Sequence, residues 1–365
     1  MSSYLDIINK REVVVCCGTG GVGKTTTAAA TALAAARAGR SAAVVTIDPA
    51  RRLANALGID ELDNTPKIIE GPWPGRLAAL MLDTKSTFDD VVTRNASNPA
   101  QAERILSNRF YRNISTTLSG TQDYMAVEKL SELYESTEWD LVVVDTPPTR
   151  DALAFLDAPL LLARLLDNPV YRMLTAPSRG GFKAVNSAAQ SMLRQLARVV
   201  GADVVDEAVA FFQSFEGMED GFRSRAMATL DLLADGRTAF VLVASPRGDT
   251  LDEARFFLDK LRGSDLEVAS VVVNRMMPAV STGAERSAVL ATTRHRRHLS
   301  AAATALADHT AAAAGDDDRV GSLMNDVGGA CLVKIPLLSS DVHDLDGLGR
   351  IADQLAGGSA RIFVE

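Results

Sequence analysis

A glycine-rich octapeptide, G-T-G-G-V-G-K-T at residues 18–25, is the strongest constraint on how this chain can fold. It directly follows the apolar run 13–17 and directly precedes a helix-forming stretch at 26–38. A strand, a glycine turn and a helix in this order predict a loop whose backbone N–H groups surround phosphate oxygens at the positive end of the helix. An ordinary strand-to-helix turn is the alternative, and the flanking segments make it much the weaker one.

Each position of the loop has an expected task. Lys24 would add a point charge to the phosphates, and the Thr25 hydroxyl would be a ligand for Mg²⁺. The motif therefore predicts ATP or ADP together with Mg²⁺ as ligands. The candidate nucleotide-binding residues of the loop are Gly18, Thr19, Gly20, Gly21, Val22, Gly23, Lys24, Thr25 and Thr26.

Short apolar runs of strand length recur along the rest of the chain. They lie at residues 41–47, 77–82, 141–144, 239–244, 268–273 and 331–335. Because the runs are continuously apolar and do not alternate, they indicate strands buried on both faces and joined by crossover helices. The predicted fold is a doubly wound, mostly parallel α/β sheet of the P-loop NTPase type, with its ligand outside the carboxyl ends of the strands.

Strand signals on both sides of a long helical middle predict one domain over residues 1–365. A helical subdomain is expected at about 155–232, and a shorter helical or loop insertion at about 281–328, where the acidic run 316–319 is expected at a helix end or in a surface loop. Apolar residues recur at helical spacing from Phe182 to Val199 and from Val204 to Phe215. These two stripes fit either packing within the protein or an exposed surface for a hydrophobic client.

Charge and composition exclude several classes of function. The formal net charge of −8 argues against a general nucleic-acid binder. The N-terminus lacks the pattern of a secretory signal, and no stretch approaches the ~20 apolar residues that span a bilayer, so we expect a cytoplasmic protein. Cys16, Cys17 and Cys331 all fall in predicted strands without metal-binding spacing, which indicates buried thiols.

Two aspartates follow predicted strands and fit the chemistry of a phosphate loop. Asp145 begins the segment D-T-P-P-T after the strand at 141–144, where a carboxylate can hold the hydration shell of Mg²⁺. Asp48 begins D-P-A after the strand at 41–47, where it can orient the attacking water. For both, the alternative role is a cap on the next helix. The phosphate loop upstream favours the functional role.

These motifs, with V-V-V-N at 271–274 and V-K-I-P at 333–336, resemble those of the arsenite-transporting (ArsA-like) and tail-anchored-protein-targeting ATPases. That family is a deviant Walker group of dimeric P-loop ATPases. The resemblance implies Mg²⁺-dependent ATP hydrolysis at a dimer interface that opens and closes with nucleotide. By position it implies that Asp48 orients water, that Asp145 lies on the magnesium side, that Asn274 reads adenine and that Pro336 lies against the base. In the targeting ATPases, helices equivalent to 182–215 form a client groove.

Departures from the family pattern are equally informative. The family loop usually reads G-K-G-G-x-G-K, whose first Lys reaches a phosphate, typically across the dimer, and this chain has Thr19 there. Arg51 and Arg52 stand where a His and a small polar residue are usual, and Arg150-Asp151 replaces a frequent Gly-His. The cysteines that bind arsenite or bridge a zinc-linked dimer have no counterparts, which argues against an arsenite pump.

The missing lysine leaves three functional alternatives open. Thr19 predicts a heterodimer with a paralogue that retains the G-K-G-G-x-G-K loop, although Arg51 or Arg52 could replace the charge within a homodimer. The chain is then either an ATPase that handles a hydrophobic client or a regulatory ATP-binding subunit with weak hydrolysis. A surface-organising ATPase is the third class, and neither terminal segment is convincing as the amphipathic or basic tail that such proteins use.

Overall fold

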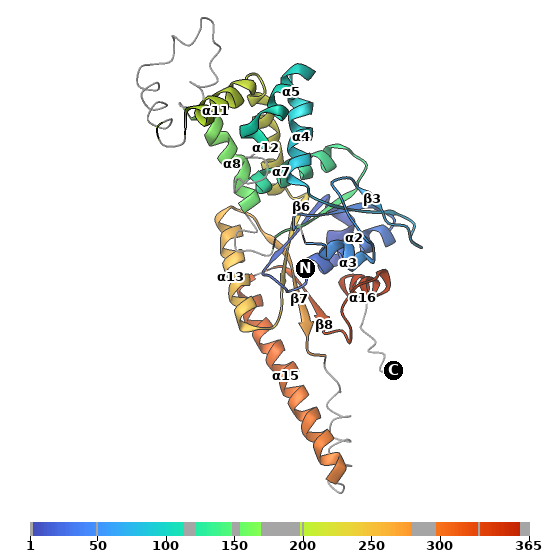
Figure 1. The fold of residues 1–365 in the computed structure, drawn as a ribbon. Coiled ribbons are helices and arrows are strands. Elements are labelled where there is room, and N and C mark those ends of the chain that lie inside the picture. The colour runs from blue at the N-terminus through green and yellow to red at the C-terminus, as the bar shows by residue number, and fades with distance from the viewer. Residues whose placement is uncertain are drawn as a thin grey trace, which may run out of the picture.

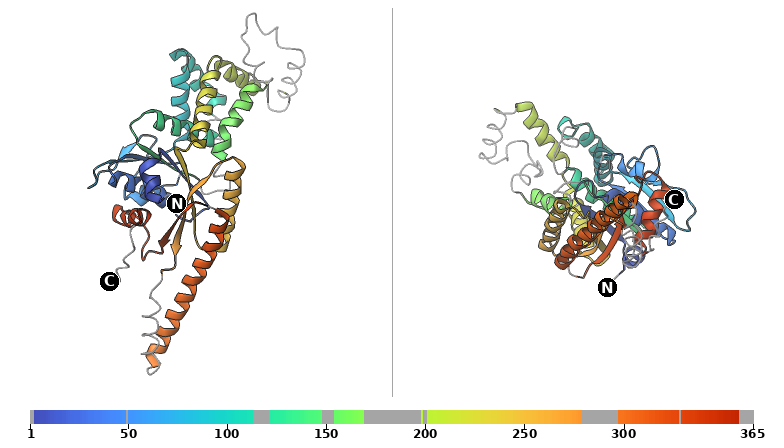
Figure 2. Two further views of the ribbon diagram at one scale, coloured as in Figure 1. Left: turned by 180° about the vertical axis from the view of Figure 1, so that it is seen from behind. Right: turned by 90° about the horizontal axis from the view of Figure 1, so that it is seen from below.

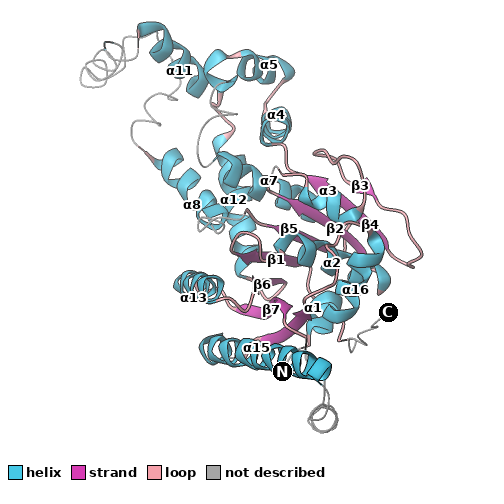
Figure 3. Cartoon of the chain, turned by 60° about the horizontal axis from the view of Figure 1, so that its bottom comes forward, coloured by secondary structure: helices cyan, strands magenta, loops and turns pink. Residues whose placement is uncertain are grey.

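An eight-stranded sheet forms the centre of the chain in a computed structural model, which describes residues 3–48, 50–112, 121–147, 154–168, 198, 201–278, 297–327 and 329–357. The strand order is β3-β4-β2-β5-β1-β6-β7-β8, and every neighbouring pair is parallel except β3 with β4 (Figure 3). The strands are β1 Val13–Gly18, β2 Ser41–Thr46, β3 Lys67–Ile68, β4 Arg76–Met81, β5 Leu141–Asp145, β6 Thr238–Ala244, β7 Val268–Met276 and β8 Cys331–Pro336.

All seven strands expected from apolar runs are confirmed. The antiparallel β3 was not predicted, because a two-residue exposed edge strand carries no apolar run. The twelve helices of the described residues are α1 Tyr4–Lys10, α2 Lys24–Arg37, α3 Arg52–Leu57, α4 Thr84–Asn95, α5 Pro99–Ser107, α7 Thr121–Glu135, α8 Ala154–Asp167, α11 Ala202–Ser214, α12 Glu219–Ala234, α13 Gly248–Gly263, α15 Arg297–Val327 and α16 Leu345–Leu355.

Helices cover both faces of the sheet, which confirms the doubly wound architecture. Alternate residues of each strand belong to different cores: Val14 and Val143 pack with α1, α2, α3 and α16, whereas Val13 and Val142 pack with α7, α12, α13 and α15. Strands buried on both sides tolerate few polar residues, which explains the continuous apolar runs in the sequence.

Helix α2 packs on the sheet through a buried surface that is built largely from alanine. Residues 28–30 and 32–36 are all buried, and all but Leu33 are alanines. Alanine combines the highest helix propensity with the smallest side chain that still packs, so a buried central helix forms without large side chains. Its first turn starts at Lys24, directly after the glycine loop.

A group of helices extends the molecule beyond one end of the sheet, and α15 points away in the opposite direction (Figures 1 and 2). The helix group includes α4 and α5, which lie between β4 and β5 in the sequence, as well as α8, α11 and α12. Its own apolar cluster contains Val91, Val92, Ala102, Ile105, Tyr111, Phe211, Phe215, Met218 and Phe222. The helical region therefore draws on two separate segments of the chain.

The structure favours internal packing for the aromatic end of the second apolar stripe. Phe211 is 3% exposed and Phe215 is 9% exposed, and their ring centroids lie 4.8 Å apart. Phe211 also stacks on Tyr111. These two side chains are core residues and do not line an open groove. The apolar residues of the first stripe, from Phe182 to Val199, lie outside the described residues, and so does Arg150-Asp151.

The acidic run at 316–319 corrects an expectation. It was expected at a helix end or in a surface loop, but it lies inside α15, and Asp316 is buried. The Asp316 carboxylate accepts hydrogen bonds from the backbone N–H of Met277 at 2.9 Å and from the Arg319 guanidinium at 2.6 Å. These partners offset the cost of burying the charge, and a local charge pattern in the sequence does not reveal them.

Replacing Phe211 by Asp should destabilise the helical region, because it removes an aromatic contact surface and buries a charge. We expect a loss of more than ~3 kcal/mol in the free energy of unfolding. Thermal melting followed by circular dichroism measures it. The matched control is Met227→Asp on α12, whose side chain is 42% exposed and should tolerate the charge. Equal melting temperatures for the two variants would show that Phe211 is not a core residue.

Candidate functional site

The loop between β1 and α2 depends on glycine at both of its ends. Gly18 has a φ of +145°, and a Cβ atom there would lie 2.1 Å from the carbonyl oxygen of Val243 on β6. Gly23 has a φ of +98° and caps α2, and its Cβ would lie 2.2 Å from Nδ2 of Asn274. The loop packs directly against the ends of β6 and β7, so neither position has room for a side chain, and both have a backbone conformation that favours glycine.

Lys24 lies within the loop and is only 6% exposed. Its Nζ donates a hydrogen bond to the Thr19 carbonyl oxygen at 2.7 Å. Burial lowers the pKa of Lys24, and the negative charges of Asp145 and Asp48 oppose that shift. The ammonium group is therefore positioned by a backbone carbonyl in the electrostatic field of two carboxylates.

Asp145 is fully buried at the carboxyl end of β5. Its Oδ2 accepts hydrogen bonds from the Thr25 hydroxyl and the Thr46 hydroxyl, both at 2.8 Å. Its Oδ1 is buried without a hydrogen-bond partner. Burial raises the pKa of Asp145 to about 6, although the two hydroxyl groups and Lys24 act against the shift.

The unpaired Oδ1 of Asp145 is the observation that tests whether Mg²⁺ fits this site. An orphaned carboxylate oxygen beside the Thr25 hydroxyl supplies the hard oxygen donors that Mg²⁺ prefers. No cluster of three or more His, Cys, Asp or Glu side chains suited to a metal occurs in the part of the chain that the structure describes. Mg²⁺ bound beside phosphates needs only one or two carboxylates, so Thr25 and Asp145 fit it.

Asp48 lies at the start of the turn after β2 and is 8% exposed. Its Oδ1 accepts a hydrogen bond from the Ala50 backbone N–H at 3.0 Å, and its Oδ2 lies 3.4 Å from Nη1 of Arg52. Arg51 is paired with Glu61 at 3.0 Å. Asp48 therefore stabilises its own turn in this conformation, and both neighbouring arginines are already paired with carboxylates.

Three further side chains support this site, and none was singled out from the sequence. Thr46 donates to Asp145 as described, and the Thr146 hydroxyl donates to the Cys16 carbonyl oxygen at 2.8 Å. Gln122, at the start of α7, donates from Nε2 to the Ile47 carbonyl oxygen at 2.8 Å. The two threonines adjoin motifs that were identified. Gln122 lies 75 residues from Ile47 in the sequence, without a local signal.

The end of β7 holds the phosphate loop from the side. Asn274 donates from Nδ2 to the Val22 carbonyl oxygen at 2.9 Å, and Arg275 donates from Nη1 to the Gly21 carbonyl oxygen at 2.9 Å. Pro336 closes the neighbouring strand β8, where the N–H of Leu337 donates to the Met276 carbonyl oxygen. Asn274 thus has a supporting role that was not expected. The adenine contacts of Asn274 and Pro336 stay predictions.

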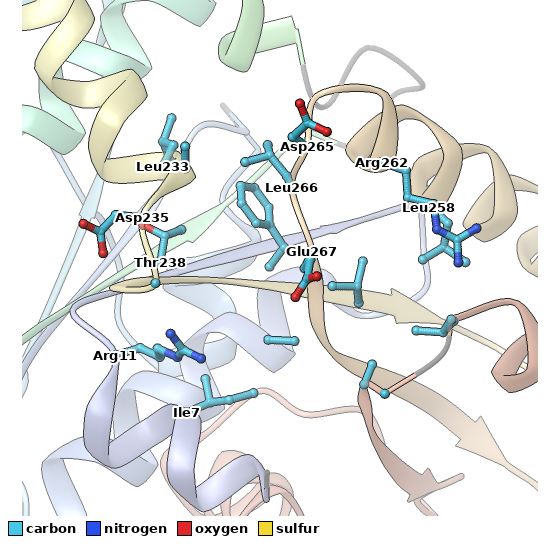
Figure 4. Close-up of a pocket in the computed structure, with 18 of the residues that line it drawn as sticks. Ile7, Arg11, Leu233, Asp235, Thr238, Leu258, Arg262, Asp265, Leu266 and Glu267 are labelled. Atoms are coloured by element: carbon cyan, nitrogen blue, oxygen red, sulfur yellow. The ribbon is translucent and has the colours of Figure 1, made fainter. Parts of the chain in front are cut away.

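A large cavity of about 1020 Å³ lies near the amino ends of β6 and β7, at the opposite ends of the strands from the glycine loop (Figure 4). Its labelled charged side chains are of both signs: Arg11, Arg262, Asp235, Asp265 and Glu267. It is remote from the glycine loop, which lies at the carboxyl ends of the strands. Ligands of doubly wound sheets bind at the carboxyl ends, so this large cavity is not the candidate nucleotide site.

A parallel α/β sheet, a glycine loop before a central helix, and a Thr–Asp pair beside that loop together define the P-loop nucleotide-binding class. A family model described as anion-transporting ATPase (ArsA) matches residues 11–297. The chain belongs to this family, which confirms the resemblance stated from its motifs and supports ATP hydrolysis at the level of the family.

Individual relatives agree with the family assignment. "ATPase get3" of Schizosaccharomyces pombe is 23% identical over 71% of this chain and 72% of its own length. "ATPase ARSA2" of Chlamydomonas reinhardtii is 24% identical over 77% of this chain and 73% of its own length. An uncharacterized protein of Streptomyces coelicolor, SCO2128, is 33% identical over 73% of this chain and 63% of its own length.

Among the described residues, the helices are too short or too polar to cross a membrane.

Replacing Asp145 by Asn should stabilise the protein free of metal and nucleotide at neutral pH. The raised pKa means that the folded chain binds the Asp145 proton more tightly than the unfolded chain. The bound proton therefore stabilises the folded chain fully below pH ~4, and this stabilisation is lost as the pH rises through about 6. The ionised form costs ~3 kcal/mol, and Asn avoids this cost.

Melting in EDTA at pH 8 and at pH 4.5 measures this effect. We expect the Asn variant to melt several degrees above the parent at pH 8, with a smaller difference at pH 4.5. Asp60→Asn is the control, because Asp60 is exposed. A stability gain that does not change with pH would contradict the electrostatic explanation.

Proposed function

We propose that this chain is a Mg²⁺-dependent ATP hydrolase that binds ATP or ADP on the loop from Gly18 to Thr26 and releases ADP and phosphate. The observation that carries the proposal is the contact between Thr25 and Asp145, which are 120 residues apart in the sequence, with the unpaired Oδ1 of Asp145 beside it. A buried carboxylate with one free oxygen is costly unless a ligand uses that oxygen.

The residues around the loop would divide the work as follows. The backbone N–H groups at the start of α2 and the Lys24 ammonium group would bind the phosphates, while Thr25 and Asp145 would hold Mg²⁺. The metal ion, when bound, neutralises charge on the phosphoryl oxygens. The Oδ1 atom of Asp48 would exchange the Ala50 N–H for the attacking water, which it would orient, while Oδ2 keeps its contact with Arg52.

The proposal extends to the base and to a second subunit. Asn274 and Pro336 lie at the ends of adjacent strands β7 and β8, where they would contact adenine. Following the family, we propose a cytoplasmic dimer that changes conformation with the nucleotide and handles a hydrophobic protein client. The alternative is a regulatory ATP-binding subunit with weak hydrolysis, whose missing loop charge comes from a paralogue that retains the G-K-G-G-x-G-K loop.

Replacing Lys24 by Ala should weaken Mg·ATP binding by ~10²-fold or more, because the loop loses its buried cation. Isothermal titration calorimetry with purified protein measures the affinity. Lys10→Ala is the matched control, because Lys10 is exposed on α1 and pairs with Asp6. If the Lys24 variant bound ATP as tightly as the parent, the loop would not be the nucleotide site.

Replacing Asp48 by Asn should leave ATP affinity nearly unchanged and lower turnover by ~10²-fold or more. The Asn side-chain oxygen can still accept the Ala50 N–H, so the turn is retained while the negative charge is lost. Calorimetry and steady-state phosphate release separate binding from turnover, with Asp60→Asn again as the control. Unchanged turnover would leave Asp48 only its structural role in the turn.

A further inference from the structure

Arg275 has an unusual backbone conformation for an arginine. Its φ is +62°, and the pairing of β7 with β8 shifts register between Val273 and Met276, on either side of it. A residue with a Cβ atom rarely adopts this left-handed conformation, because it is sterically strained. Irregularities of this kind at strand ends change the direction of a side chain, often beside a functional site. Here the side chain of Arg275 contacts the phosphate loop.

The Arg275 guanidinium is held at the loop but is not neutralised. Nη1 donates to the Gly21 carbonyl oxygen at 2.9 Å, and the residue is exposed. No carboxylate of the described residues forms an ion pair with Arg275, whereas Arg51 pairs with Glu61 and Arg52 pairs with Asp48. A guanidinium group has five N–H donors, and this contact uses one of them.

The positions of the other cations make Arg275 distinctive. Lys24 already points into the loop and bonds to the Thr19 carbonyl oxygen, and Thr19 itself carries no charge. Arg52 could approach a phosphate only by leaving Asp48. Arg275 would exchange one neutral carbonyl acceptor for a phosphate oxygen, and charge-assisted hydrogen bonds are roughly twice as strong as neutral ones.

We infer that Arg275 binds the phosphates of the nucleotide and supplies the positive charge that Thr19 cannot provide. The inference rests on the proposed function, since it requires that ATP binds on the loop from Gly18 to Thr26. A guanidinium group matches phosphate geometry with two parallel donors and remains charged at any physiological pH. Arg275 thus offers a source for the missing charge within this chain, so a lysine from a paralogue is not required.

Arg275→Gln and Arg275→Lys form the central test. The Gln amide can still donate to the Gly21 carbonyl oxygen but is neutral, whereas Lys keeps the charge. We expect the Gln variant to lose ~10-fold or more in Mg·ATP affinity and ~10²-fold or more in turnover, and the Lys variant, which keeps the charge but not the paired donors, to lose clearly less of both. ATP affinity of the Gln variant should also fall less steeply with added salt than that of the parent.

A lysine at position 19 provides a rescue experiment, because it returns a positive charge to the loop. Thr19→Lys in the Arg275→Gln background should restore at least part of the affinity and turnover. Arg350→Gln, on the exposed surface of α16, is the control and should change neither. Melting temperatures identify any variant that fails to fold. If Arg275→Gln does not fold, the ATP affinity and turnover of Arg275→Lys are compared instead with those of the parent and of Thr19→Lys.

The outcomes separate this inference from the proposed function. If Lys24→Ala abolishes ATP binding while Arg275→Gln matches the parent, the loop assignment holds and the role of Arg275 is rejected. Equal losses in the Gln and Lys variants, without rescue by Thr19→Lys, would show that Arg275 only supports the Gly21 turn and would also reject it. If neither Lys24→Ala nor Arg275→Gln changes ATP binding, the proposed function fails first.

Discussion

The buried carboxylate of Asp145 is the feature on which the arrangement of the site depends. It lies at the end of the central strand β5, and its Oδ2 joins the first turn of α2 through Thr25 and the end of β2 through Thr46. The Thr46 hydroxyl in turn accepts the Asp48 backbone N–H at 3.3 Å. A single carboxylate therefore sets the positions of the phosphate loop and of the Asp48 turn relative to each other, at an electrostatic cost that burial makes large.

The contacts continue from this centre toward the helical region. Gln122 begins α7 and donates to the Ile47 carbonyl oxygen, directly beside Asp48. Farther along α7, Glu128 accepts from Arg225 of α12 at 3.0 Å, and Arg225 donates to Asn95 of α4 at 2.7 Å. The Asp48 turn is thus connected through hydrogen bonds and α7 to the helices α4 and α12. Rearrangement of the Asp48 turn would directly disturb the first turn of α7.

The sequence predicted the parts of this fold that depend on local pattern. Continuous apolar runs located seven strands because strands buried on both faces tolerate few polar residues, and the glycine loop was identified because its backbone needs glycine at Gly18 and Gly23. Interactions between distant segments were not predictable. The partners of Gln122 and Asp316, and the contact of Arg275 with Gly21, arise only when strands and helices are assembled.

The charge balance of the site explains why the missing loop lysine matters. Around the loop, the positive charges of Lys24 and Arg52 balance the negative charges of Asp145 and Asp48. Mg·ATP is itself a net anion, so its arrival would leave the site negative, and hydrolysis spreads further negative charge over the γ-phosphoryl oxygens. An additional cation is therefore an electrostatic requirement of fast turnover. Arg52 meets it poorly because it would leave the nearly buried Asp48 carboxylate without its ion pair, and Arg275 meets it at the loss of a single neutral hydrogen bond.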